Sequence, residues 1–141
     1  MPSATFSKFN SFTEAFMEKV HNLGSDTLKV MLTNSAPSSS NTQKSDITDI
    51  SPGNGYSAGG TAATISSSAQ TSGTYKLVLA DVTITASGGG IGPFRYAVLY
   101  NDTASNKELI GFWDYGSNLT LANGESLLVD FSAVNGVLQV T

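Results

Sequence analysis

The sequence contains no cysteine, and this absence removes three kinds of chemistry at once. Disulfide cross-links, thiolate-bound metal sites and a thiol nucleophile all need that side chain. Histidine is almost as scarce, because His21 is the only one in 141 residues. A metal centre built on several histidines is therefore excluded. A Ser–His–acid triad would have to use His21, and no serine lies in the G-x-S-x-G turn of many hydrolases.

Charge is also in short supply. Charged residues make up 13% of the chain, against roughly a quarter in ordinary soluble domains. The net charge is −4, and the seven Lys and Arg residues are scattered, which argues against nucleic acid as a partner. Ser and Thr fill about a quarter of the chain. A hydroxyl surface costs less to desolvate than unpaired charges, so it suits contact with other proteins, although it is equally typical of a Ser/Thr-rich β-protein.

Long apolar runs are missing as well, so we expect no membrane partner. The first twelve residues lack the basic start, apolar stretch and cleavage site of a secretory signal. We therefore expect synthesis in a cytoplasm. The length of 141 residues is enough for one compact domain and too short for two, so we predict a single domain over 1–141.

The hydrophobic pattern predicts one helix followed by strands. A 3.6-residue period predicts a helix over 11–23, with a capping box from Ser11 to Glu14, His21 in the last turn and Gly24 ending it. Short alternating segments then predict about eight strands, with hairpin turns at 71–73, 101–107 and 123–124. The predicted fold is mainly β, an antiparallel β-sandwich or jelly roll with one N-terminal α-helix.

The segment 34–60 is a long polar stretch rich in Ser, Asn, Gly and Pro. Loops of this length are unusual within a small domain, and they tend to be functional or disordered. Its only strong apolar side chains are Ile47, Ile50 and Tyr56. We therefore predict a flexible loop within the domain that becomes ordered against a partner, through these three side chains.

The run GGGIGPF (88–94) has the glycine density of a phosphate-binding loop. Such a loop needs Lys and Ser or Thr directly after its last glycine, and then a helix. Here Gly92 is followed by Pro93, and an alternating strand pattern comes next. We interpret the glycines as a bend at a corner of the sheet, with Pro93 at the first position of a strand.

Other candidate sites for chemistry are weak. The oxygen-rich segments 46–49 and 101–106 do not match the spacing of an EF-hand loop. Asp114 and Asp130 lie on predicted strands and would suit a glycosidase, but solvent-facing carboxylates explain them equally simply. We therefore predict no enzyme activity, no cofactor and no metal site.

Aromatic residues on the predicted strands give a further indication. Alternation would bury about half of Trp113, Tyr115, Tyr96 and Tyr100, and core packing accounts for them. If Trp113 and Tyr115 face outward instead, they form a platform for sugar stacking or protein contact. Arg95 is the only arginine, and it suits a local salt bridge or a bridge to a partner's carboxylate.

The overall pattern resembles a family of small structural proteins from tailed bacteriophages. The blocks that carry the resemblance are FNSFTEAFMEKVHNLGSDTLKVMLTNSAP, ISPGNGYSAGG, AQTSGTYKLVLADVTITASGGGIGPFRYAVLYND and ELIGFWDYGSNLTLANGESLLVDF. Members are typically encoded beside the major capsid protein, and they include the cement, or decoration, proteins that clamp the outside of a mature head. The resemblance covers nearly the whole chain, but it has no catalytic motif and assigns no individual residue.

The resemblance implies a location and partners. It implies a jelly-roll-like β-sandwich on the outer surface of the virion capsid, made in the host bacterial cytoplasm. It also implies contact with the major capsid protein and with other copies of this chain, as a dimer or a trimer. We expect the contacts to come from the first ten residues of the N-terminal arm and helix (1–24) and from the 34–60 loop. The expected contact residues are Phe6, Phe9, Ile47, Ile50, Tyr56 and Arg95.

Three alternatives remain open at this point. The chain fits a β-sandwich protein of a phage tail, neck or baseplate, present in few copies. It fits a carbohydrate-binding adhesin module, which needs an exposed aromatic platform. A small β-sandwich hydrolase would need a pocket with two close carboxylates.

Overall fold

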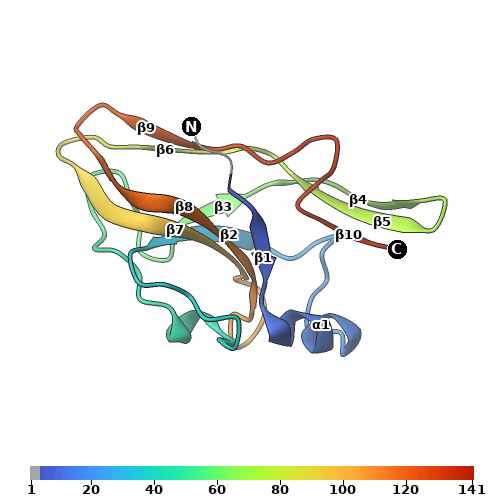
Figure 1. Ribbon diagram of the computed structural model, residues 1–141. Helices are drawn as coiled ribbons and strands as arrows, with labels where there is room; N and C mark the ends of the chain where they lie inside the picture. Colours follow the sequence, from blue (N-terminus) through green and yellow to red (C-terminus); the bar gives the residue numbers. More distant parts are fainter. Residues whose placement is uncertain (1–3) are drawn as a thin grey trace.

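The computed structural model describes residues 4–141, and these form a mainly β structure with one α-helix (Figure 1). The mainly β class predicted from the sequence is confirmed, but the described residues form ten strands instead of about eight. In chain order the elements are β1 (Phe6–Lys8), α1 (Asn10–Met17), β2 (Leu28–Thr33), the short 3₁₀-helix η1 (Lys44–Asp46), β3 (Thr61–Ala63), β4 (Ile65–Thr71), β5 (Thr74–Leu79), β6 (Val82–Thr85), β7 (Ile91–Asn101), β8 (Leu109–Leu121), β9 (Ser126–Val129) and β10 (Leu138–Val140).

The strands form three antiparallel sheets. The largest has five strands in the order β1-β8-β7-β2-β3, the second has the order β10-β5-β4, and the third pairs β6 with β9. Figure 1 shows β6, β9 and the β4–β5 hairpin along one side of the large sheet. The predicted sandwich or jelly roll is not confirmed, because the strands opposite the large sheet are divided between two small sheets.

Both faces of the five-stranded sheet are buried. The main core lies between this sheet and the two smaller ones, and Leu28, Val30 and Leu32 of β2 face it, as the alternation predicted. Residues of opposite parity on β2 and β7 point to the other face. A second cluster covers that face, and it consists of Phe9, Met31, Ile47, Val98, Tyr100 and Leu109.

The helix begins differently from the prediction. Phe9 occupies the N-cap position with extended backbone angles, and no side chain caps the first turn. The predicted capping box from Ser11 is therefore wrong. A capping box does occur at η1, where Gln43 and Asp46 exchange side-chain and backbone hydrogen bonds.

The helix also ends earlier than predicted. The chain leaves it at Lys19, whose φ is 70°, and the N–H of Val20 donates to the carbonyl of Ala15 at 2.9 Å. Such a closing turn is usually made by glycine, but here lysine makes it, and Gly24 lies well beyond. His21 is therefore not in the last helical turn; its side chain is buried farther along the chain.

Two of the three predicted hairpins are confirmed, namely β4–β5 and β7–β8. The third, through the turn at 123–124, is wrong. The turn itself exists, since the N–H of Glu125 donates to the carbonyl of Ala122 at 2.9 Å. However, β8 continues alongside β7, whereas β9 pairs with β6 in a different sheet. The turn thus carries the chain from one layer to the other, which local sequence does not reveal.

The glycine run does form a bend before β7. Gly88 and Gly89 have φ values of 83° and 157°, and a Cβ on Gly90 would lie 2.9 Å from the carbonyl oxygen of Leu121. The interpretation of these glycines as a bend is therefore supported. The position predicted for Pro93 is wrong, because β7 already begins at Ile91 and the pairing with β8 shifts register between Ile91 and Phe94.

The segment 34–60 is folded against the large sheet and does not project as an arm. Ile47 is buried in the second cluster. Backbone bonds tie the segment down along its length: Asn10 N–H donates to Ser39, Leu109 N–H to Thr42, and Ile50 N–H to Leu32, at 2.9–3.2 Å. The predicted arm at 1–24 is likewise anchored through β1 and α1, and its residues 1–3 lie outside the described residues.

Asp49 organises the second half of this segment, which is hydrogen-bonded to the sheet through Tyr56 and Gly59. Its carboxylate accepts from the hydroxyl of Tyr56 at 2.5 Å and from the N–H of Gly59 at 2.6 Å. The Tyr56 hydroxyl in turn accepts from the N–H of Leu32 at 2.9 Å, and Tyr100 donates to the carbonyl of Gly59 at 2.6 Å. Burial, and then the bond to Asp49, raise the pKa of Tyr56 well above its usual value. A neutral phenol is therefore kept as a donor.

We predict that Asp49→Ala lowers the free energy of unfolding by about 1–3 kcal/mol, because it leaves two donors of the loop without their charged acceptor. Tyr56→Phe removes one of the same bonds, so a double-mutant cycle between the two positions should show coupling. Thr48→Ala, at an exposed neighbouring position, is the control. Chemical denaturation measures the wild type, the two single variants, the double variant and the control, and additive effects of the two single substitutions would contradict the shared network.

Candidate functional site

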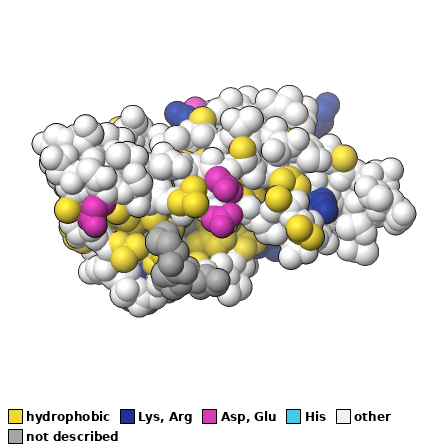
Figure 2. Space-filling view, turned by 90° about the horizontal axis from the view of Figure 1, so that it is seen from above, with side chains coloured by type: hydrophobic (Ala, Val, Ile, Leu, Met, Phe, Trp, Pro, Cys, Tyr) yellow, Lys and Arg dark blue, Asp and Glu magenta, His cyan; other side chains and the backbone are white. Residues whose placement is uncertain are grey.

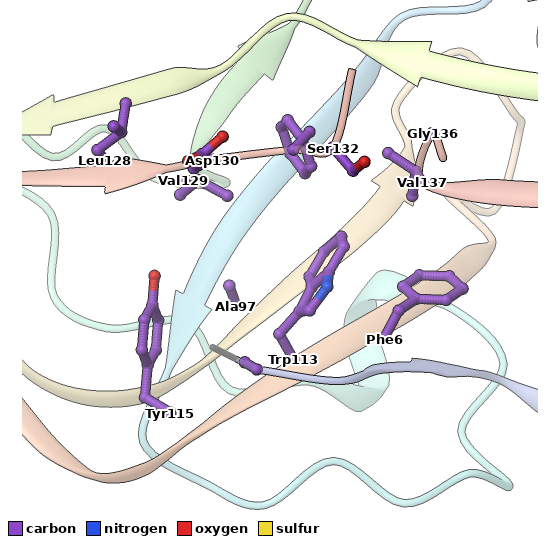
Figure 3. A pocket seen from close by; sticks show the side chains of 12 residues that line it. Phe6, Ala97, Trp113, Tyr115, Leu128, Val129, Asp130, Ser132, Gly136 and Val137 are labelled. Carbon is purple, nitrogen blue, oxygen red and sulfur yellow. The ribbon is translucent and has the colours of Figure 1, made fainter. Parts of the chain in front are cut away.

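A pocket of about 370 Å³ opens between the large sheet and the segment from β9 to β10. Figure 3 shows Tyr115, Trp113 and Phe6 in a row along one wall, with Val129 and Val137 on the opposite wall. We call this pocket the aromatic groove. Its lining residues are Ala4, Phe6, Ala97, Trp113, Tyr115, Leu128, Val129, Asp130, Phe131, Ser132, Gly136 and Val137.

Trp113 lies at the centre of the groove. Its ring centroid is 5.1 Å from that of Phe6 and 5.7 Å from that of Phe131, with interplanar angles of 53° and 57°. Tilted contacts of this kind suit the charge distribution of aromatic rings. Phe6 comes from β1, Trp113 from β8 and Phe131 from the segment after β9, so three separate parts of the chain build one aromatic cluster.

Gly111 allows β1 to pair with β8 while the Phe6 ring packs over the β8 backbone. The two strands pair with Phe6 opposite Trp113 and Lys8 opposite Gly111. A Cβ on Gly111 would meet the Phe6 ring at 2.1 Å and the Ser7 carbonyl oxygen at 2.9 Å. No real side chain fits there, so the position of Phe6 in the groove depends on this glycine.

Tyr115 forms one end of the row. It lies two residues beyond Trp113 and therefore on the same face of β8, and its ring contacts that of Phe94 edge-on at 6.4 Å. Burial raises the pKa of its hydroxyl. Beyond it the pairing of β8 with β7 is interrupted, because the register shifts between Tyr96 and Phe94. The groove thus ends where β8 bulges.

Charge is nearly absent from the groove. Asp130 is the single charged residue among those lining it, and Figure 3 shows its side chain turned away from the aromatic row. Figure 2 shows apolar side chains on the upper face of the molecule, with acidic side chains between them at its centre. Leu128, at the groove, is 44% exposed and Val134, on the segment after β9, is 76% exposed. An aromatic, charge-poor surface of this kind has the composition of the centre of a protein interface.

The predicted contact residues are dispersed. Phe6 lies in the groove, but Phe9 and Ile47 lie in the second core cluster and Tyr56 in the main core. Ile50 is partly buried against the main core. Three of these side chains are thus enclosed by the chain itself. A contact between any of them and a partner stays a prediction.

Arg95 forms the local salt bridge that was one of its two expected roles. Its Nε and Nη2 donate to the two carboxylate oxygens of Asp114 at 2.8 and 3.1 Å, and its guanidinium lies 5.4 Å from the centre of the Tyr96 ring. The guanidinium, and then the N–H of Gly116, lower the pKa of the Asp114 carboxyl. Arg95 and Asp114 are well exposed, so we expect the pair to add little stability.

Tyr96 and Tyr100 do not extend the aromatic row. Ala97 is paired with Trp113 and faces the groove, so its neighbour Tyr96 points to the opposite face. Tyr100 is buried in the second cluster, and burial is the main cause that raises its pKa to about 12. Trp113 and Tyr115 pack partly buried against the main core, as the core-packing interpretation expected, and their rings also line the groove.

The residues 4–141 contain no group of three or more metal-ligating side chains placed to hold an ion. No helix within this range combines the length and the apolar character that crossing a bilayer requires.

Sequence reasoning missed the second wall of the groove. Phe131 and Val129 alternate within ESLLVDFSA, and this pattern marked them as facing one side of a strand. The pattern could not show that this strand would pair with β6 and lie opposite β8. Only the sheet order brings Phe131 to Trp113.

Comparisons of the chain with protein-family models, with curated proteins and with solved structures found no match.

We predict that Gly111→Ala lowers the free energy of unfolding by about 1–3 kcal/mol, because the added methyl group forces Phe6 and β1 away from β8. Trp113 is the only tryptophan, so its fluorescence should shift to the red as water reaches the groove. In a Phe6→Ala background the same glycine substitution should cost less. An equal cost in both backgrounds would show that Phe6 is not the obstacle.

Proposed function

We propose that this protein is a structural component of a bacteriophage particle that binds the outer surface of the head and staples neighbouring major capsid protein subunits. The observation that carries the proposal is the aromatic groove, with exposed Leu128 at it and exposed Val134 on the segment after β9. The resemblance of the sequence to capsid cement proteins supports the choice of partner. Finer features of that family, including a jelly-roll fold and dimers or trimers of the chain, belong to the proposal as well.

The surface chemistry supports a protein as the partner. Aromatic and aliphatic groups line the groove, and burying them against a complementary surface releases water and is favourable. The remaining surface is dominated by hydroxyl and amide groups, since charged residues are only 13% of the chain. Such groups form hydrogen bonds with a partner at lower desolvation cost than charges do.

The fold supports a staple that acts mechanically. The 34–60 segment is tied to the large sheet by the hydrogen bonds from Leu32 to Tyr56 and from Tyr100 to Gly59, and by the packing of Ile47. A body held in one shape transmits force between the subunits it touches. Many copies with modest contacts then add through avidity around the shell.

A binding experiment with capsid heads tests the proposal. Heads lacking the protein are mixed with wild-type chain, Leu128→Asp or Val134→Asp, and bound copies are counted by quantitative protein staining. We expect wild-type occupancy comparable to that of the major capsid protein. Each Asp variant should bind at least about tenfold more weakly, because the new carboxylate is desolvated without a partner.

Met17→Asp is the matched control, because Met17 is 76% exposed on α1 and does not line the groove. It should bind like the wild type. Only a few copies per particle would indicate a tail, neck or baseplate protein. Full occupancy by all three variants would show that the groove is not the interface.

A second candidate is a carbohydrate-binding module, because Trp113 and Tyr115 face the groove side by side. Sugars stack on such rings through their C–H faces. Binding of the wild-type chain on a glycan array, lost in Tyr115→Ala but kept in Tyr96→Ala, would favour this function over the capsid.

A further inference from the structure

A buried polar cluster surrounds His21, outside the aromatic groove. His21 lies between α1 and β2 and is only 6% exposed. Its ring packs on that of Phe12, with centroids 5.2 Å apart. Its Nδ1 lies 3.0 Å from Nδ2 of Asn101, the last residue of β7, which is fully buried.

The orientation of the Asn101 side chain is determined by its other partners. Its Oδ1 accepts from the N–H groups of Thr103 and Ala104 at 3.0 and 3.2 Å. Its Nδ2 donates to the carboxylate of Asp26 at 2.7 Å. Rotating the amide by half a turn would point N–H groups at two backbone N–H groups and an oxygen at a carboxylate. The NH₂ group therefore faces His21.

This orientation determines the protonation of His21. Because Asn101 Nδ2 donates, His21 Nδ1 has to accept, so it carries no proton. The ring is then neutral, with its proton on Nε2. His21 Nε2 and Glu108 Oε2 are buried atoms without a hydrogen-bond partner among residues 4–141.

The surroundings act on the charge of His21 in two directions. Burial disfavours the imidazolium, and it outweighs the carboxylates of Glu108, just before β8, and Asp26, just before β2, which favour it. The net result is a pKa of His21 below its usual 6.5. Lys19 and Tyr75, from the end of α1 and from β5, line a shallow hollow beside the same ring.

The cluster joins segments that are distant in sequence. The chain after α1 is tied to the β7–β8 loop by the N–H of Thr27, which donates to Thr103 Oγ1 at 2.8 Å, and by the N–H of Asp102, which donates to the Thr27 carbonyl at 2.8 Å. Glu108 forms an isolated antiparallel β-bridge, through the backbone, with Gln43 in the 34–60 segment. The bond between His21 and Asn101 is the buried link among these contacts.

We propose that His21 is a pH-sensitive latch: a proton taken up from solvent at Nδ1 turns the acceptor into a donor that faces Asn101, breaks their bond, and loosens the segment 18–27 and α1 from the end of β7. The inference is independent of the capsid proposal. Because the folded state takes up this proton less readily than the unfolded chain, the stabilisation is complete above pH 6.5 and is lost as the pH falls below it.

Imidazole NMR tests the first step directly, because His21 is the only histidine. At pH 8 the ring should be neutral, with the proton on Nε2, and it should titrate below pH 6.5. Amide hydrogen exchange tests the second step. After correction for intrinsic rates, opening of the segment 18–27 should rise by up to about tenfold per pH unit between 6.5 and the folded-state pKa. A proton on Nδ1 at pH 8 would overturn the proposal.

Variants separate the latch from general acid unfolding. His21→Asn places an amide oxygen where Nδ1 stood, so it accepts from Asn101 at every pH, and the opening of 18–27 should no longer change between pH 7.5 and 5. Glu108→Gln removes a carboxylate that favours the charged ring, so the His21 ring should titrate at lower pH and the rise in opening should extend to lower pH. Glu14→Gln, on the exposed side of α1, should leave both unchanged. Equal acid loosening in wild type and His21→Asn would overturn the latch, and the NMR result decides the case if that variant fails to fold.

Discussion

The large sheet is buried on both faces, and most of the structure follows from this constraint. On β7, Ala97 and Leu99 face the main core while Val98 and Tyr100 face the second cluster. A sheet with two apolar faces needs cover on both sides. The smaller sheets cover one side, and since residues 4–141 form only one α-helix, the other side is covered by Phe9 and by the long 34–60 segment.

A sheet face covered by irregular chain creates a second requirement. The backbone N–H and C=O groups of that chain form no strand-to-strand hydrogen bonds, so they need other partners. A few polar side chains supply these partners. Asp49 and Tyr56 satisfy amides of the long segment and of β2. Asn101 accepts hydrogen bonds from two backbone amides of the β7–β8 loop, and Asp102 forms salt bridges with Lys29 and Lys107. Asp49 and Asp102 thus lie where loops meet the sheet.

The aromatic groove exists because the layer opposite the large sheet is discontinuous. β1 pairs with only three residues of β8, and β9 pairs with β6 alone. The rings of Trp113 and Tyr115 therefore stay half-buried, where a continuous second sheet would have enclosed them. The same division of strands gives the molecule its most interface-like surface, and this is why the proposed function is placed there.

The sequence by itself determined the periodic elements. Alternation of apolar and polar residues identified β2 and β6, and turn residues identified the hairpins β4–β5 and β7–β8. Both signals depend only on residues close together in the sequence. The capping box at Ser11 and the helix end at Gly24 were wrong, because Phe9 is the N-cap residue and the chain leaves the helix at Lys19. The hairpin at 123–124 was wrong because β9 pairs with β6, a distant strand.

The tertiary structure alone decided which side chains meet. The segment 34–60 has the composition of a free loop, yet Ile47 packs on the buried face of β2 and β7, and Tyr56 and Gly59 are hydrogen-bonded to those strands. Phe6, Trp113 and Phe131 are more than a hundred residues apart at their extremes, and only sheet order joins them. Composition determined the kind of surface this protein offers, whereas strand pairing across distant segments determined where on the molecule it lies.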